Sequence, residues 1–134
     1  MVLGVDVGGT KIAVAAVKDM AAMYGVEHPT VIDSTEALLD GLEAAVREVM
    51  EHSGQPEAIG VGVPSQIDYV TGTVETSVNI PLTGVPLREE LGRRFGVPVF
   101  VDNDANCATL GEWWLGAARG ATAGAFPGRG RPDH

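Results

Sequence analysis

A dense cluster of polar side chains occupies residues 102–106. It holds two carboxylates and two amides: Asp102, Asn103, Asp104 and Asn106. Three β-forming residues, 99–101, precede the cluster, and a helix-forming run, 107–118, follows it. Polar groups at the carboxyl end of a strand are placed to bind a ligand, and a helix N-terminus would hold an ionised Asp there. A helix cap needs only one such residue, so the cluster favours a functional site.

A second candidate is the first turn of the chain. Gly8 and Gly9 separate two apolar runs, 2–7 and 11–17, which the sequence predicts as the strands of a hairpin. Two glycines let the backbone approach a ligand closely and adopt positive φ. Successive N–H groups in such a turn can bind an anion. A plain hairpin with a Gly-Gly turn explains the same spacing, so both interpretations stay open.

Three polar residues flank this glycine turn. Asp6, at the strand end, could hold a magnesium ion directly or through water, because Mg²⁺ takes carboxylates together with phosphates. Thr10 could add a hydroxyl and Lys11 a positive charge. Together they would suit a phosphorylated ligand.

The composition is that of an ordinary globular chain and argues against several classes of function. The 134 residues, 45% apolar and 20% charged, suffice for one hydrophobic core. A net charge of −9 argues against nucleic acid as the main partner. Cys107 is the only cysteine, so no disulfide framework is expected. No apolar run approaches the roughly 18 residues of a membrane helix, and no signal peptide is visible, which favours a cytoplasmic protein without a membrane partner.

The first half of the chain predicts further elements that would position these side chains. An edge strand is expected at residues 20–26, with His28 as a solvated loop residue beyond it. A helix begins after Asp33 or Ser34, and Asp33 and Glu36 have the spacing of a capping box. Apolar residues at helical intervals continue this helix until Ser-Gly-Gln-Pro stops it.

The second half predicts two more strands, a hairpin and a short helix. Residues 58–64 form a strand with two glycines, which often mark close approach of a ligand. Residues 67–70 and 73–76 flank Thr-Gly as the arms of a hairpin. Residues 86–95 form a short helix with Pro at its start, and the strand before the polar cluster follows. We therefore expect an α/β fold with a mixed sheet and flanking helices.

Four motifs in this order resemble the ROK family of sugar kinases and repressors. They are residues 5–12 (VDVGGTKI), 60–68 (GVGVPSQID), 79–81 (NIP) and 101–106 (VDNDAN), the last continued by 108–112 (ATLGE). The resemblance implies the ribonuclease-H-like fold that actin, heat-shock ATPases and sugar kinases share. It also implies transfer of a phosphoryl group from ATP to the 6-hydroxyl of a hexose, with glucose expected first and polyphosphate left open as the donor.

The resemblance also implies roles for individual residues. Asp104 matches the catalytic base that accepts the proton of the attacking hydroxyl. Asn103 and Asp104 match positions that bind the sugar hydroxyls, and Asn79 is expected to join them. The residues that match the loop facing ATP and Mg²⁺ are Asp6, Gly8, Gly9, Thr10 and Lys11, with Asp6 toward the metal.

The sequence departs from the family pattern in two places. Ser65 stands where Gly is common. The family's larger C-terminal domain, with the adenosine site, is not recognised, so we expect a kinase N-terminal domain at 1–120, an irregular tail at 121–134, and weak or no activity alone. The alternatives are a non-catalytic sugar-binding remnant and a ROK-type regulator. Without the second domain, an apolar face of this domain would be uncovered. We therefore predict self-association as a homo-oligomer.

Overall fold

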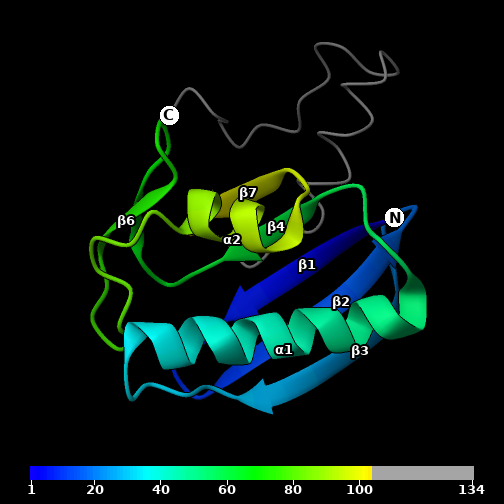
Figure 1. Ribbon diagram of the computed structural model, residues 1–134, viewed down its shortest axis with the longest axis horizontal. Coiled ribbons are helices and arrows are strands. Elements are labelled where there is room, and N and C mark those ends of the chain that lie inside the picture. The colour runs from blue at the N-terminus through cyan, green and yellow to red at the C-terminus, as the bar shows by residue number, and fades with distance from the viewer. Residues whose placement is uncertain (104–134) are drawn as a thin grey trace.

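The computed structural model describes residues 1–103, and the predicted helix-forming run at 107–118 and tail at 121–134 lie outside them. Five strands form one mixed sheet in the order β3-β2-β1-β4-β7, and two form a separate hairpin, β5-β6. Two helices accompany them, which confirms the predicted fold class (Figure 1). The elements in chain order are β1 (Val2–Val7), β2 (Lys11–Lys18), β3 (Ala21–Pro29), α1 (Thr35–Ser53), β4 (Ile59–Gly62), β5 (Gln66–Asp68), β6 (Thr73–Thr76), α2 (Leu87–Phe95) and β7 (Val99–Asp102).

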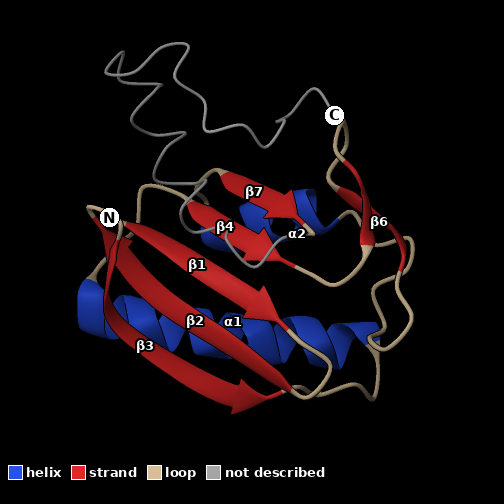
Figure 2. Ribbon diagram, turned by 180° about the vertical axis from the view of Figure 1, so that it is seen from behind, coloured by secondary structure: helices blue, strands red, loops and turns tan. Residues whose placement is uncertain are grey.

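The direction of the strands brings the candidate residues to one edge of the sheet. β1 pairs in parallel with β4, and β4 in parallel with β7. β2 runs antiparallel to both β1 and β3. The arrows of β1, β4 and β7 therefore point the same way in Figure 2, and the segments that follow these three strands leave the sheet at the same edge.

Both helices lie on one face of the sheet, behind the strands in Figure 2. Alternate residues of β1, namely Leu3, Val5 and Val7, are at most 1% exposed and belong to the same apolar cluster as Leu38 and Leu42 of α1. Successive side chains of a strand point to opposite faces. The helix-covered face therefore holds the main core, and the residues between these three project to the other face.

The start of α1 shows which of two possible caps the chain uses. The Ser34 side chain accepts a hydrogen bond of 3.0 Å from the N–H of Ala37, so Ser34 and not Asp33 is the N-cap. The predicted capping box of Asp33 and Glu36 is wrong, because Ser34 as the N-cap puts Ala37 at the third helical position; the Glu36 carboxylate instead lies 2.9 Å from Arg94 of α2. Neither of the two described helices is long and apolar enough to cross a membrane.

β3 is longer than predicted and begins one residue later. Asp19 and Met20 have φ of 54° and 66°, the left-handed pair that a tight two-residue hairpin turn requires, so Met20 belongs to the turn. His28 lies within the strand, opposite Ile12, and is not a loop residue. Its Nε2 is 2.7 Å from Oε1 of Glu48 in α1. This contact between distant segments explains why the sequence alone placed His28 wrongly.

Arg94 joins the two helices through a network of charges. Its side chain is 15% exposed, and its guanidinium lies 2.8–3.1 Å from carboxylate oxygens of Glu36, Asp40 and Glu43 in α1. Arg47 pairs with Glu43 at 2.8 Å and donates to the carbonyl of Arg94 at 2.9 Å. Hydrogen bonds from Arg47 and Arg94 lower the pKa of Glu43 below its ordinary value. Such a network contributes more to stability than an isolated exposed pair.

The lowered pKa of Glu43 predicts a pH-dependent contribution to folding. A carboxyl whose pKa is lower in the folded than in the unfolded chain stabilises above its unfolded value, about 4.3 for Glu, and loses that contribution as the pH falls through the folded pKa. We expect Glu43→Gln to lower the free energy of unfolding by about 1 kcal/mol near neutral pH, with the difference shrinking as the pH falls below the unfolded value of about 4.3. Urea unfolding across this range would measure it. An equal pH-dependent loss in Glu51→Gln, an exposed residue of α1, would contradict the assignment.

Candidate functional site

Two carboxylates lie in one row across the sheet, at the edge where the parallel strands end. Asp6 is in register with Gly62, and Gly62 with Asp102. Neighbours in register project to the same face, so the two Asp side chains lie on the same face of the sheet. β4 runs between their two strands, and the residue that it contributes to this row is Gly62, which has no side chain. Two inter-strand spacings separate their Cα atoms by about 10 Å. Asp6 is exposed and Asp102 only 8% exposed, which makes Asp6 the more accessible carboxylate.

Asp102 shapes the turn that follows β7. Its Oδ1 accepts the N–H of Asn103 at 2.7 Å and the hydroxyl of Tyr69 at 3.1 Å. Its main-chain carbonyl accepts the N–H of Val63 at 2.9 Å, which ties the ends of β4 and β7 together. Asn103 therefore leaves the sheet on a held backbone, with an exposed side chain.

The remaining polar residues of this cluster, Asp104 and Asn106, lie outside the described residues. The role predicted for Asp104 as a catalytic base therefore rests on the sequence. The last described residue, Asn103, follows the end of β7, which lies beside the end of β4.

The Gly-Gly turn is tight, for a reason that differs from the prediction. Positive φ at Gly8 and Gly9 was expected, but the positive-φ glycines of the described chain lie elsewhere. The N–H of Gly8 instead donates to the carbonyl of Lys11 at 2.9 Å, and a Cβ on Gly8 would lie 3.0 Å from that oxygen. The hydroxyl of Thr30 donates to the carbonyl of Gly8 at 2.9 Å. Close approach of backbone is therefore what requires glycine here.

Thr10 and Lys11 lie at this turn, as predicted, and both are exposed. The Nζ of Lys11 is 3.3 Å from the carboxylate of Glu27 on β3. An ion pair between two exposed side chains is weak, so this contact does not commit the ammonium to Glu27. The carbonyl of Thr10 accepts the N–H of Thr30 at 2.9 Å, which holds the turn against the segment after β3.

Asp6, the residue predicted to hold a magnesium ion, presents an accessible carboxylate. It is exposed, and its neighbours in register, Ala13 and Gly62, are small. Such an ion takes one or two carboxylates and completes its shell with water and phosphate oxygens. Within residues 1–103 no group of three or more His, Cys, Asp or Glu side chains could hold a metal. Asp6 by itself would therefore supply only one of the ligands of such an ion.

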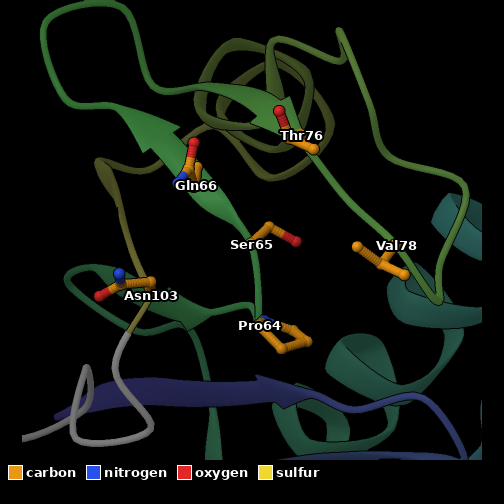
Figure 3. A pocket seen from close by; sticks show the side chains of 6 residues that line it. All are labelled: Pro64, Ser65, Gln66, Thr76, Val78 and Asn103. Carbon is orange, nitrogen blue, oxygen red and sulfur yellow. The ribbon is translucent and has the colours of Figure 1, made fainter.

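An open cleft of about 420 Å³ lies beside Asn103 (Figure 3). Asn103 stands on one side of it, the segment that follows β4 forms its floor, and residues at the end of β6 stand on the other side. The lining residues are Pro64, Ser65, Gln66, Thr76, Val78 and Asn103. Hydroxyl and amide groups beside apolar carbon are the mixture that a small polar ligand with C–H faces requires.

Asn79 lies next to the glycine turn rather than in the lining of the cleft. A Cβ on Gly9 would lie 3.8 Å from the Cβ of Asn79. The loop that carries Asn79 is held to the first turn of α1, since the Thr35 hydroxyl donates to the carbonyl of Pro81 at 2.7 Å. Asn79 is exposed, and its neighbour Val78 lines the cleft. The structure thus brings the predicted phosphate loop and the predicted sugar loop together.

Several residues in or beside the cleft were not predicted as site residues from the sequence. Gln66, Thr76 and Val78 line the cleft, and Ser65, noted only as a departure from the family pattern, forms a hydrogen bond of 3.1 Å with the hydroxyl of Ser77. The rule that ligands bind after parallel strands could have found Gln66. Thr76 and Val78 come from the end of a hairpin strand, and only tertiary packing places them at this edge.

Residues 2–124 match the ROK family. A glucokinase of Thermotoga maritima is 38% identical over 122 residues, which cover 88% of this chain and 38% of that enzyme. An N-acetyl-D-glucosamine kinase of Vibrio parahaemolyticus is 39% identical over 116 residues, 85% of this chain and 38% of the relative.

Solved structures agree with the sequence relatives. A ROK family glucokinase from Streptomyces griseus, solved in complex with glucose and AMPPNP, superposes with a TM-score of 0.73 at 36% identity and covers 89% of this chain and 38% of its own. A ROK hexokinase from Thermus thermophilus gives the same TM-score and identity over 83% of this chain and 37% of its own. The chain thus spans about two fifths of the length of these relatives. It belongs to the ROK family.

Proposed function

We propose that this chain provides the sugar-binding and catalytic-base part of an ATP-dependent hexose kinase. The observation that carries the proposal is the cleft beside Asn103, which opens at the same sheet edge as the Asp6–Lys11 turn. Phosphoryl transfer depends on positioning an acceptor hydroxyl against a phosphate. A polar cleft beside a glycine turn on one rigid sheet supplies that juxtaposition. The similarity to glucokinases and an N-acetyl-D-glucosamine kinase supports the same reaction.

The sugar is proposed to bind between Asn103 and the hairpin side of the cleft. The Asn103 amide offers both a donor and an acceptor to hydroxyl groups, and its backbone is held by Asp102. Val78, 87% exposed, offers an apolar surface to the C–H face of a ring. Asn79 approaches from the loop beside Gly9 and is proposed to contact the part of the sugar nearest the phosphate.

Asp104 is proposed as the general base. A carboxylate that follows Asn103 directly is at the correct place in the sequence to accept the proton of the 6-hydroxyl as that oxygen attacks the γ-phosphorus. The bond from the γ-phosphorus to the leaving oxygen of the donor breaks as the new one forms. Removal of the proton by a positioned carboxylate favours this attack.

The glycine turn is proposed to face the phosphates. The backbone around Gly8 and Gly9 can approach an anion closely, and Thr10 and Lys11 are exposed beside it. Lys11 is free to exchange its weak contact with Glu27 for a phosphate oxygen. Asp6 would hold Mg²⁺, which neutralises the charge that develops on the phosphoryl oxygens.

Glucose is the proposed sugar, and N-acetyl-D-glucosamine is the second candidate because relatives of both kinds match at similar identity. The cytoplasm, where ATP and free hexoses meet, is the proposed location. Self-association is also proposed, and gel filtration over a range of concentrations would test it. A monomer at every concentration would contradict that part of the proposal.

Replacing Asn103 by Ala is expected to weaken glucose binding about tenfold, since two hydrogen bonds of roughly 0.5–1.5 kcal/mol each would be lost. Isothermal titration of the 134-residue chain with glucose, mannose, fructose, N-acetylmannosamine and N-acetyl-D-glucosamine measures this and ranks the sugars. Gln55→Ala is the matched control, because it removes an exposed amide from the loop before β4, at the opposite end of that strand. Unchanged affinity in Asn103→Ala would contradict the proposed sugar site.

A further inference from the structure

Tyr69 reaches the end of β7 from another part of the chain. It lies in the loop between β5 and β6, and its hydroxyl donates to Oδ1 of Asp102 at 3.1 Å. The same oxygen accepts the N–H of Asn103 at 2.7 Å. One carboxylate oxygen therefore joins the hairpin loop to the backbone of the residue at the cleft. Asp102 is 8% exposed, so water competes weakly for these hydrogen bonds.

The loop that carries Tyr69 is itself fixed at several points. Oδ1 of Asp68 accepts the N–H groups of Val70 at 3.0 Å and Thr71 at 3.4 Å. Arg88 of α2 donates to the carbonyls of Tyr69 at 3.4 Å and Val70 at 2.7 Å. The side chain of Arg88 packs so closely on Gly72 that a Cβ there would collide with it. The phenol is therefore presented from a braced loop, which makes it an effective support for Asp102.

We propose that Tyr69 is a positioning residue for the sugar site, which acts through Asp102 to fix the backbone at Asn103. This inference rests on the function proposed above. The Tyr69 hydroxyl orients the Asp102 carboxylate, and the oriented carboxylate holds the Asn103 N–H, so that the amide side chain of Asn103 enters the cleft in one direction. A site held in this way binds its ligand with less ordering of side chains and backbone.

Tyr69→Phe tests the proposal because it keeps the ring and removes only the hydroxyl. We expect hydrogen exchange at the Asn103 amide to become about tenfold faster, and glucose affinity to fall roughly three- to tenfold, since a hydrogen bond to a charged group is lost. Two-dimensional NMR of the ¹⁵N-labelled chain and calorimetric titration measure these effects. Tyr24→Phe, the only other tyrosine, removes a hydroxyl from β3 and is expected to change neither quantity.

Two variants at Asp102 distinguish a positioning role of the Tyr69–Asp102 contact from a general contribution to stability. Asp102→Asn keeps an acceptor oxygen for both donors and is expected to retain glucose affinity within about threefold. Asp102→Ala removes the acceptor and is expected to lower glucose affinity about tenfold or more. Thermal unfolding of each variant gives its stability. A purely structural role would move the unfolding temperature and leave both the Asn103 amide and glucose affinity unchanged.

The NMR measurement separates this inference from the function on which it rests. An Asn103 amide that does not respond to Tyr69→Phe overturns the positioning role, whether or not the chain binds glucose. An amide that responds in a chain that binds none of the hexoses supports the link through Asp102 and overturns the proposed sugar site. Loss of affinity in Asn103→Ala without loss in Tyr69→Phe upholds the sugar site and overturns the positioning role.

Discussion

Replacing Asp104 by Asn is expected to slow phosphorylation of glucose about 10²- to 10⁴-fold, the usual contribution of a positioned general base. The amide has nearly the same shape as the carboxylate and still hydrogen-bonds a hydroxyl, but it cannot accept the proton of the attacking oxygen. Glucose affinity should therefore change only a few-fold while the rate falls.

Transfer of labelled γ-phosphate under single-turnover conditions, with protein in excess, measures this rate even if turnover is slow. Low activity is expected for the 134-residue chain, which spans 38% of the Thermotoga maritima glucokinase. Parallel reactions with polyphosphate identify the donor. Asp33→Asn is the control, because it makes the same change at an exposed position before α1. Equal rates for the unchanged chain and Asp104→Asn, both above the background without protein, would show that another group takes the proton.

Leu42→Ala is expected to lower the free energy of unfolding by about 2–5 kcal/mol. Leu42 is 0% exposed and belongs to the cluster that joins α1 to the sheet. Its loss removes apolar contacts and leaves a cavity between α1 and the sheet. Since small domains are stable by only about 5–15 kcal/mol, this one change removes a large part of the total.

Equilibrium unfolding in urea measures the change. Val70→Ala is the comparison at an exposed position, because Val70 is 84% exposed. Its free energy of unfolding should stay within about 0.5 kcal/mol of that of the unchanged chain. A similar loss in both variants would contradict the placement of the core under α1.

Local signals in the sequence were strong enough to predict most of the fold. Ser34 and Gly54 mark the ends of α1, and Gly96 ends α2 in the left-handed conformation, φ 70°, where glycine is favoured. The strands that end at Val7 and Asp102 are mostly apolar, with valine at positions 2, 5, 7, 99 and 101, as is typical of buried strands. The order of elements in the described part therefore agrees with the prediction.

What the sequence could not provide were contacts between distant segments. His28 was assigned to a loop, because nothing near it in the sequence indicates Glu48, its partner in α1. The contact of Glu36 with Arg94 of α2 was likewise not predicted, because the two residues lie in different helices. The contact of Tyr69 with Asp102 was not predicted, because the two residues lie 33 positions apart and meet only through packing of the hairpin. A pattern of neighbouring residues carries no information about such pairs.

A hexose is proposed to bind in the cleft beside Asn103. The most direct test is a titration of the ¹⁵N-labelled chain with glucose, followed by two-dimensional NMR. We expect the largest saturable shifts on Ser65, Gln66, Val78, Asn79 and Asn103, and we expect Asn103→Ala to abolish or strongly weaken them. Shifts centred elsewhere, such as on β3 and the exposed side of α1, or no shifts with any of the hexoses, would contradict it.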